Sequence, residues 1–217
     1  HLAIESFGLA PKLYPCCGST HRVLDGVLAL RQAHGFTDAD VEKVETLVGY
    51  GNARNLCYPD PQQEMEARFS MNYCVAVALR FGKVSLADFT IPSVQRPELR
   101  ALLPIVHMEA RDADAEGNDP ASRLPHEVRI TLRDGQVLEA DVLDTRGSAS
   151  NPFTQADVEA KFRDCCEGFL APDDLMAAWQ ALTHAEALED VNALTRHLGF
   201  EASSDRGERF LARLQAA

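Results

Sequence analysis

The sequence predicts an α+β protein in which helices precede and follow a central segment with antiparallel strands. Two runs of alternating apolar and polar residues, at 127–133 and 136–143, flank the dipeptide Asp134–Gly135, a strong signal for a tight hairpin turn. After residue 154, by contrast, apolar residues recur only at helical spacing. A chain of 217 residues, 46% of them hydrophobic, can bury a substantial core in one or two domains.

The first element is a polar loop at residues 12–21, with the sequence K-L-Y-P-C-C-G-S-T-H. Pro15 and Gly18 punctuate it, which indicates a loop of preset shape and not a helix interior. A helix should follow and end near Gly35, because apolar residues then recur at helical spacing (Val23, Leu24, Val27 and Leu28).

The junction between this loop and its helix suits an anionic ligand. Ser19 or Thr20 stands where a residue caps a helix, and His21 would lie in the first turn. The positive end of the helix dipole favours a bound anion there, such as a carboxylate. Capping alone also explains Ser19 and Thr20, so a purely structural loop is the alternative.

Strands and short helices should follow in the middle of the chain. Val44, Thr46 and Val48 alternate with Glu45 and Leu47, which predicts a strand over residues 41–50. The further elements expected are a loop at 51–63, an amphipathic helix at 66–81 closed by Gly82, helical turns at 85–89 and 97–103, a strand at 105–111 and a surface loop at 112–125.

Residues 145–152, rich in Gly and Ser, form the clearest boundary in the chain. Apolar stripes beyond it predict helices to the end of the sequence. Their members are Val158, Phe162 and Cys165; Leu175, Met176, Trp179 and Leu182; Leu188, Val191, Leu194 and Leu198; and Phe210, Leu211 and Leu214.

Composition and charge exclude several classes of protein. The net charge of −12 argues against general binding to nucleic acid or to a membrane surface. No apolar run approaches the length of a membrane span, and nothing marks the chain for export, so we expect a cytoplasmic protein. The six cysteines include no C-x-x-C pair, and the histidines outside the loop show no ligand spacing. We therefore predict reduced thiols, no metal and no iron–sulfur cluster.

Three ordered stretches resemble the MmgE/PrpD family. They are K-x-Y-P-x-C-x-x-T-H in the loop, E-A-R-F-S-M-N-Y at residues 66–73, and N-P-F-T at 151–154 followed by K-F at 161–162. The family includes 2-methylcitrate dehydratases, aconitate decarboxylases and iminodisuccinate epimerases. The likeness implies an α+β lid domain at residues 35–150, inserted into an all-α domain to which residues 1–34 and 151–217 contribute. It also implies the C-terminal half of a longer protein and an enzyme without a cofactor.

The resemblance points to three residues that would act on the substrate. Lys12 would face the active site and meet a substrate carboxylate, although an exposed surface lysine is the alternative. Tyr73 would polarise a carboxylate or donate a proton, unless it is a core tyrosine on an apolar helix face. His21 suits abstraction of a proton α to a carboxylate, and a role in organising the loop is equally open.

Four residues would line the substrate pocket. Arg68 would clamp a carboxylate through two hydrogen bonds or stay a solvated charge. Ser19 and Thr20 would line the pocket, together with Cys17. Cys17 departs from the aconitate decarboxylase-like members, which have a histidine at this position of the loop; the difference leaves dehydration or epimerisation more open than decarboxylation.

Two functions of different class follow. The first is a lyase or isomerase of a small di- or tricarboxylic acid, most similar to 2-methylcitrate dehydratase, in which a proton α to a carboxylate is removed. Its expected partners are the N-terminal helical half of the protein and a second copy in a homodimer, so the isolated half should have little activity. The second is a non-catalytic module that binds a carboxylate or a partner chain.

Overall fold

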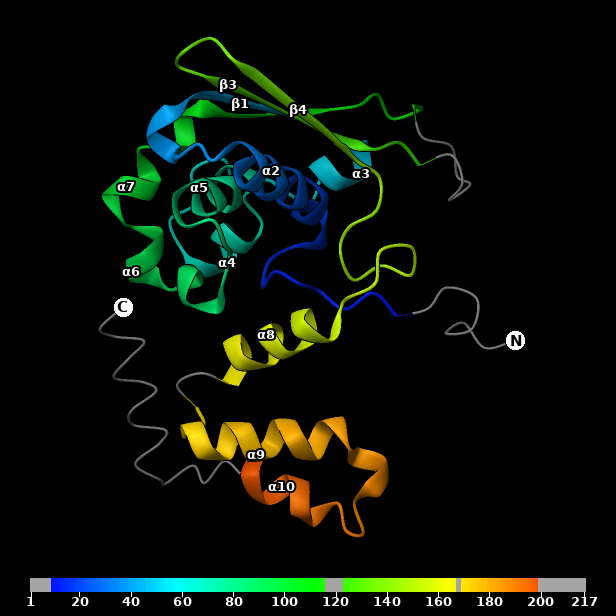
Figure 1. Cartoon of the computed structure of the whole chain (residues 1–217). Helices are drawn as coiled ribbons and strands as arrows, with labels where there is room; N and C mark the ends of the chain where they lie inside the picture. The colour runs from blue at the N-terminus through cyan, green and yellow to red at the C-terminus, as the bar shows by residue number, and fades with distance from the viewer. Residues whose placement is uncertain (1–8, 116–122, 167–168, 199–217) are drawn as a thin grey trace. The chain divides into compact units, whose positions relative to one another are not determined.

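The computed structural model describes residues 9–115, 123–166 and 169–198, which divide into two compact units. Unit 1 comprises residues 1–152 and unit 2 comprises residues 153–217. Unit 1 combines helices with one sheet, which confirms the predicted α+β class (Figure 1). The predicted three-part division at residues 34 and 150, with a flanking all-α domain, stays a prediction. The last predicted stripe, at Phe210, Leu211 and Leu214, lies outside the described residues.

Unit 1 is built on a four-stranded mixed sheet with the order β2-β1-β3-β4. The strands are β1 (Val41–Val48), β2 (Val106–Ala110), β3 (His126–Leu132) and β4 (Val137–Val142). β1 pairs antiparallel with β3, and β3 with β4, but β1 and β2 run parallel. The predicted antiparallel strands are present in two of the pairings, whereas the parallel pairing of β1 with β2 was not predicted. The chain between β1 and β2 passes through helices before it returns, and such a crossover makes the two strands parallel.

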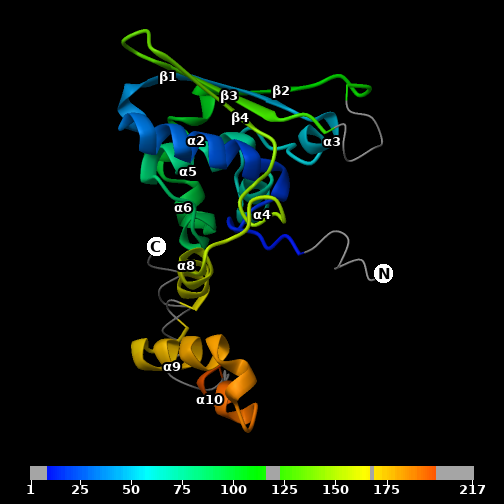
Figure 2. The same cartoon turned by 45° about the vertical axis from the view of Figure 1, so that its right-hand side comes forward.

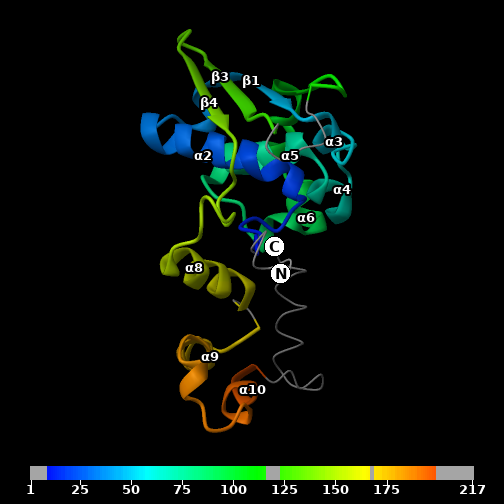
Figure 3. The same ribbon diagram turned by 90° about the vertical axis from the view of Figure 1, so that its right-hand side faces the viewer.

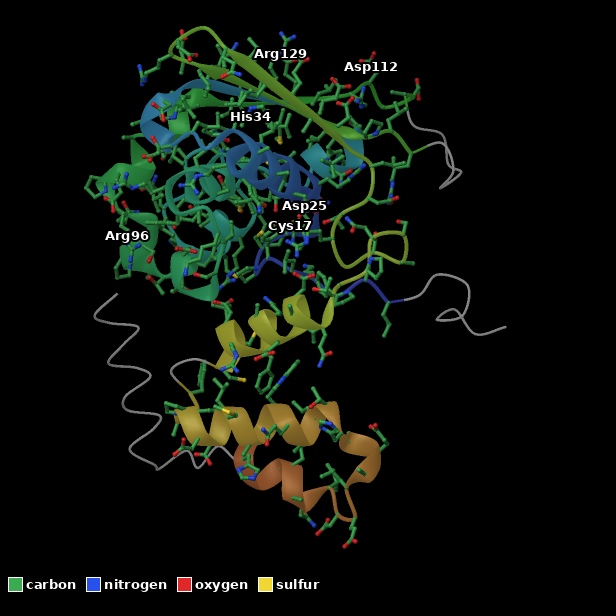
Figure 4. All side chains as sticks on the ribbon, viewed as in Figure 1. Cys17, Asp25, His34, Arg96, Asp112 and Arg129 are labelled. Carbon is green, nitrogen blue, oxygen red and sulfur yellow. The ribbon has the colours of Figure 1, made fainter. Side chains whose placement is uncertain are left out.

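Alternation along the strands separates a core face from a solvent face. Val44, Thr46 and Val48 are buried, as are Val128 and Ile130, while the intervening residues lie on the other face. Arg129 lies on this second face, opposite Glu139 in the register and ion-paired with it (Figure 4). The hairpin turns at Asp134–Gly135 as predicted, since Gly135 has the positive φ of 89° that glycine readily adopts.

Two helices cover the core face of the sheet (Figure 2). α2 (His21–His34) packs against β3 and β4, and α5 (Met71–Phe81) packs against β2 and α2. Gly35 and Gly82 end these helices in the left-handed conformation, as the sequence predicts. α5 is buried on nearly every side, so it is the central element of unit 1.

The helix predicted over 66–81 is divided into two. α4 (Glu64–Arg68) ends at Phe69, and α5 begins after Ser70, whose Oγ accepts a hydrogen bond from the Tyr73 N–H at 3.1 Å. The side-chain oxygen satisfies a helix N-terminal donor, so a new N-terminus forms inside a pattern that is apolar throughout.

Short elements connect the main ones. Tyr50, predicted to end β1, instead begins α3 (Tyr50–Ala53) within the segment predicted as a loop. The others are α6 (Ile91–Val94), α7 (Pro97–Arg100), η1 (Gly18–Thr20), η2 (Asp38–Asp40), η3 (Leu86–Phe89) and η4 (Leu103–Ile105). η3 and α7 match the predicted helical turns, whereas α6 was not predicted.

Gly26 lets α2 approach the sheet closely. A Cβ at this position would lie 3.0 Å from Val128 Cγ2 and 3.4 Å from Val142 Cγ2. Gly26→Leu is therefore expected to lower the free energy of unfolding of unit 1 by about 2–3 kcal/mol through overpacking, as measured by denaturant unfolding followed by far-UV circular dichroism. Gly51→Leu is the matched control, because a Cβ at Gly51 meets nothing within 4 Å. Equal stability of the two variants would contradict this account.

Unit 2 is helical in its described part, as predicted. It contains α8 (Gln155–Cys166), α9 (Pro172–Thr183), η6 (Ala185–Ala187) and α10 (Asn192–Leu198). The Phe162 and Trp179 rings pack with their centroids 5.4 Å apart, and Leu175 is buried. Other members of the predicted stripes are exposed, including Met176 and Val191. Among the described residues, no helix combines the length and apolar character needed to cross a membrane.

Candidate functional site

The loop at residues 12–21 is held in place by backbone and side-chain contacts to α4. The Cys17 N–H donates to the Arg68 carbonyl at 2.9 Å, and Arg68 Nη1 donates to the Pro15 carbonyl at 2.5 Å. The loop therefore has one fixed shape where it enters α2, and Figure 3 shows this entry beside α4. Figure 4 labels Cys17 in this loop and Asp25 in α2.

A second set of contacts ties the loop to α2. The Tyr14 hydroxyl donates to Asp25 Oδ1 at 2.6 Å, and Asp25 Oδ2 accepts from Thr145 Oγ1 at 2.8 Å and from the Arg146 N–H at 2.9 Å. Burial, together with the Asp25 carboxylate, raises the pKa of Tyr14 above its ordinary value. Tyr14 therefore stays protonated and anchors the loop.

Neither Ser19 nor Thr20 caps α2 through its side chain. Thr20 occupies the N-cap position, but its hydroxyl donates back to the Cys17 carbonyl at 2.8 Å. Ser19 Oγ instead accepts hydrogen bonds from Asn52 Nδ2 at 3.2 Å and Asn55 Nδ2 at 3.1 Å. The predicted cap is therefore wrong, because the tight turn of η1 directs both hydroxyls elsewhere.

His21 begins α2, as predicted, but it is 97% buried, since only 3% of its surface is exposed. Its ring packs edge-on against the Tyr14 ring, with centroids 5.1 Å apart. Its Nε2 has no hydrogen-bond partner within the described part of the chain. An unprotonated imidazole nitrogen can accept a hydrogen bond or a proton, but this one is closed to solvent in the structure.

One buried thiol, Cys16, lies beside His21, and a second, Cys74, lies beside Cys16. Hydrogen bonds from Cys74 and from His21 lower the pKa of Cys16 to about 5, although burial opposes this shift. Burial raises the pKa of Cys74, and its contact with Cys16 adds to the effect. Cys16 Sγ also lies 3.1 Å from Thr20 Oγ1. Cys16 therefore carries the more acidic thiol of the pair, behind the loop surface.

Two cationic side chains belong to this region: Lys12 is the first residue of the loop, and Arg68 is the last residue of α4. Lys12 is exposed, and a Cβ at Gly18 would lie 4.0 Å from Lys12 Cε. Arg68 is half-buried, with its guanidinium 4.9 Å from the centroid of the Phe89 ring. Its bond to Pro15 makes it a support of the loop, and a guanidinium has further N–H donors that could bind an anion.

Tyr73 lies in the core behind this surface. None of its surface is exposed, and its hydroxyl donates to the Asp88 carbonyl at 2.5 Å. Its ring packs against Phe89, with 5.8 Å between centroids, so Phe89 contacts both Tyr73 and Arg68. Burial raises the pKa of Tyr73 above its ordinary value. The structure thus groups Cys17, Ser19, Thr20, His21 and Arg68 at the loop and the start of α2, and Tyr73, like Thr20 and His21, is buried.

Sequence reasoning missed a buried polar network that contacts Ser19 through Asn52. Asn52 Oδ1 lies 3.3 Å from both Arg22 Nη2 and His126 Nε2. His126 is fully buried, and burial, reinforced by Arg22, Arg111 and Arg123, lowers its pKa to about 3. Asn52 is 33 residues from Ser19 in sequence, so no local spacing connects them.

The arrangement suits a small anionic ligand. An ammonium, a guanidinium and hydroxyl groups surround the N-terminal end of a helix, and each of these favours negative charge. In the described ranges, no group of three or more His, Cys, Asp or Glu residues could hold a metal ion. The fold and site therefore define an α+β domain whose polar loop is suited to an anion such as a carboxylate.

Comparison with known proteins places the chain in a family. Residues 14–184 match the MmgE/PrpD C-terminal domain. The chain therefore belongs to the MmgE/PrpD family, which confirms the resemblance of the three motifs. The match begins two residues after Lys12 and includes every other predicted site residue.

The chain is also similar to two curated proteins. It is 28% identical to the cis-aconitate decarboxylase of Mus musculus over 212 residues, which cover 95% of this chain and 42% of the relative. It is 29% identical to the cis-aconitate decarboxylase of Homo sapiens over 198 residues, covering 88% and 40%. The chain thus spans about two-fifths of the length of the curated relatives it matches.

Proposed function

We propose that the protein containing this chain is a lyase acting on a small di- or tricarboxylic acid, and that its reaction begins with removal of a proton α to a carboxylate. The observation that carries the proposal is the loop at residues 12–21. It lies almost wholly within the family match and gathers anion-binding groups at the start of α2. Both curated relatives are named as cis-aconitate decarboxylases, and cis-aconitate is a tricarboxylic acid, which supports the class of substrate.

The residues have distinct roles in this proposal. Lys12 binds a substrate carboxylate with its exposed ammonium, and the free edge of Arg68 adds a second cation. His21, whose buried Nε2 is unpartnered in the described part of the chain, is the proposed proton acceptor within this chain and must become accessible to the substrate to act. Tyr73 supports Phe89 and Arg68 from the core and does not touch the substrate. The remaining acid and base groups come from the part of the protein beyond this chain.

Two reactions compete within this class. The cysteine at position 17, where the resemblance implies a histidine in decarboxylases, favours dehydration of a 2-methylcitrate-like acid. The names of the two relatives favour decarboxylation of cis-aconitate. Assays with 2-methylcitrate, citrate, cis-aconitate and iminodisuccinate, each followed by its product, distinguish dehydration, decarboxylation and epimerisation.

Lys12→Ala is expected to reduce kcat/KM of the whole protein about 10- to 100-fold on the acid that it converts. The lost interaction is one hydrogen bond between charged groups, of about 1.5–3 kcal/mol. Lys83→Ala is the matched control, since Lys83 is equally exposed but follows the far end of α5. Equal rates in the two variants would remove Lys12 from the site while leaving the function intact.

A carboxylate-binding module without catalysis is the second candidate. The observation that favours it is that the chain aligns with only about two-fifths of the length of each curated relative. A protein that contains this chain need not contain catalytic groups outside it. The whole protein would then bind the inert tricarboxylate tricarballylate in a calorimeter and convert none of the four acids. A homodimer and the N-terminal helical half are proposed partners of either form.

A further inference from the structure

The orientation of the Asn52 amide is determined by its neighbours. Arg22 Nη2 lies 3.3 Å from Asn52 Oδ1, and a guanidinium donates hydrogen bonds but accepts none. The amide oxygen must therefore face Arg22. His126 Nε2, 3.3 Å from the same oxygen, must then carry its proton and donate as well. With the oxygen committed to these two donors, the Asn52 NH₂ group faces Ser19.

Ser19 receives two hydrogen bonds and has one left to give. Asn52 Nδ2 and Asn55 Nδ2 both donate to Ser19 Oγ, at 3.2 and 3.1 Å. These bonds occupy the two lone pairs of the hydroxyl oxygen, so its proton points away from both amides. Among the described residues, this proton has no acceptor. Because only 5% of Ser19 is exposed, and buried polar groups are rarely left unpaired, a ligand oxygen would be a suitable partner.

We propose that Asn52 and Asn55 are positioning residues that preset the Ser19 hydroxyl as a hydrogen-bond donor to a substrate carboxylate. This inference rests on the proposed function and names how the same site selects its ligand. Ser19 follows Gly18 in the sequence, and a Cβ at Gly18 would lie 4.0 Å from Lys12 Cε. In this proposal a carboxylate that pairs with Lys12 also accepts a hydrogen bond from Ser19, and because the two amides already orient the hydroxyl, no rotation of it opposes binding.

Asn52→Asp reverses the direction of the hydrogen bond between residue 52 and Ser19, with little change in side-chain shape. An aspartate keeps an oxygen towards Arg22 and His126, but its second oxygen accepts the Ser19 proton in place of donating to it. We expect Asn52→Asp and Ser19→Ala each to weaken binding of tricarballylate to the whole protein about 10- to 100-fold, the range for one hydrogen bond to a charged group. Calorimetric titration measures the affinity, and thermal unfolding of each variant confirms that it is folded.

A double-mutant cycle separates this role from the added charge of the aspartate. If Asn52 acts through Ser19, the variant carrying both changes binds no more weakly than Ser19→Ala alone. Additive losses would overturn the proposal, since they would mean that the aspartate repels the ligand directly. Asn55→Ala introduces no charge and removes one donor; its expected loss is a few-fold, which should vanish in the Ser19→Ala background.

The same measurements distinguish failure of this inference from failure of the proposed function. Tricarballylate binding that responds to the variants as described, without turnover of any acid, supports the positioning role and rejects the lyase. Turnover by a protein whose Ser19→Ala variant binds and reacts normally supports the lyase and rejects the positioning role. A protein that binds no carboxylate overturns both.

Discussion

Replacing Tyr73 by alanine is expected to lower the free energy of unfolding of unit 1 by about 3–5 kcal/mol, the usual cost of removing a large aromatic side chain from a core. The side chain is fully buried and its ring packs against Phe89, so the cavity would lie at the centre of the unit. Tyr73→Phe should cost about 1–2 kcal/mol, because it leaves the buried Asp88 carbonyl without its hydrogen bond.

Amide hydrogen exchange of peptides from α5 measures this loss locally. The fluorescence of Trp179, the single tryptophan, would not serve, since it lies in unit 2. Tyr50→Phe is the matched control, because Tyr50 is 44% exposed and should change neither stability nor exchange. If Tyr73→Phe retained full stability but lost more than tenfold in turnover, Tyr73 would belong to the catalytic groups and the packing role would be refuted.

Acidification is expected to destabilise unit 1 through His126. Its pKa is about 3 in the folded chain, against about 6.5 in an unfolded one. Between these values the unfolded state binds a proton that the folded state does not, so stability falls as pH drops from about 6.5 to about 3. The slope is about 1.4 kcal/mol per pH unit, which amounts to about 2 kcal/mol lost by pH 5.

His126→Gln isolates this contribution from that of the other titrating groups. Glutamine retains an N–H donor for Asn52 but binds no proton in this range. Denaturant unfolding at pH 7 and pH 5 should therefore show a smaller loss for the variant than for the unmodified protein, by about 2 kcal/mol. Parallel losses in both proteins would show that His126 is protonated equally in the folded and unfolded states.

Elements defined by short-range chemistry could be predicted from the sequence. The hairpin at Asp134–Gly135 and the ends of α2 and α5 at Gly35 and Gly82 each depend on backbone conformations that glycine readily adopts. The division between α4 and α5 was missed because the surrounding residues are apolar enough for one continuous helix. Only the hydrogen bond from Tyr73 N–H to Ser70 Oγ marks the new start.

Pairings over long sequence distances could not be predicted in the same way. The parallel register of β1 with β2 depends on where the intervening helices return the chain, and alternation within a strand carries no information on its neighbour. Family resemblance located the loop and Arg68, but not the direction of their side chains. Tyr73 shows the difference: a helix position next to the site still points its side chain into the core.

The central position of β1 has a consequence for the order in which the chain folds during synthesis. Both neighbours of β1 are made after it, and pairing with β3 requires residues up to Leu132. Until then β1 has an unpaired edge, which is open to contact with other chains. The bond between Arg68 and Pro15 likewise spans 53 residues. The site loop therefore leaves the ribosome before the residues that fix its shape, and it acquires that shape only once these later, non-local contacts form.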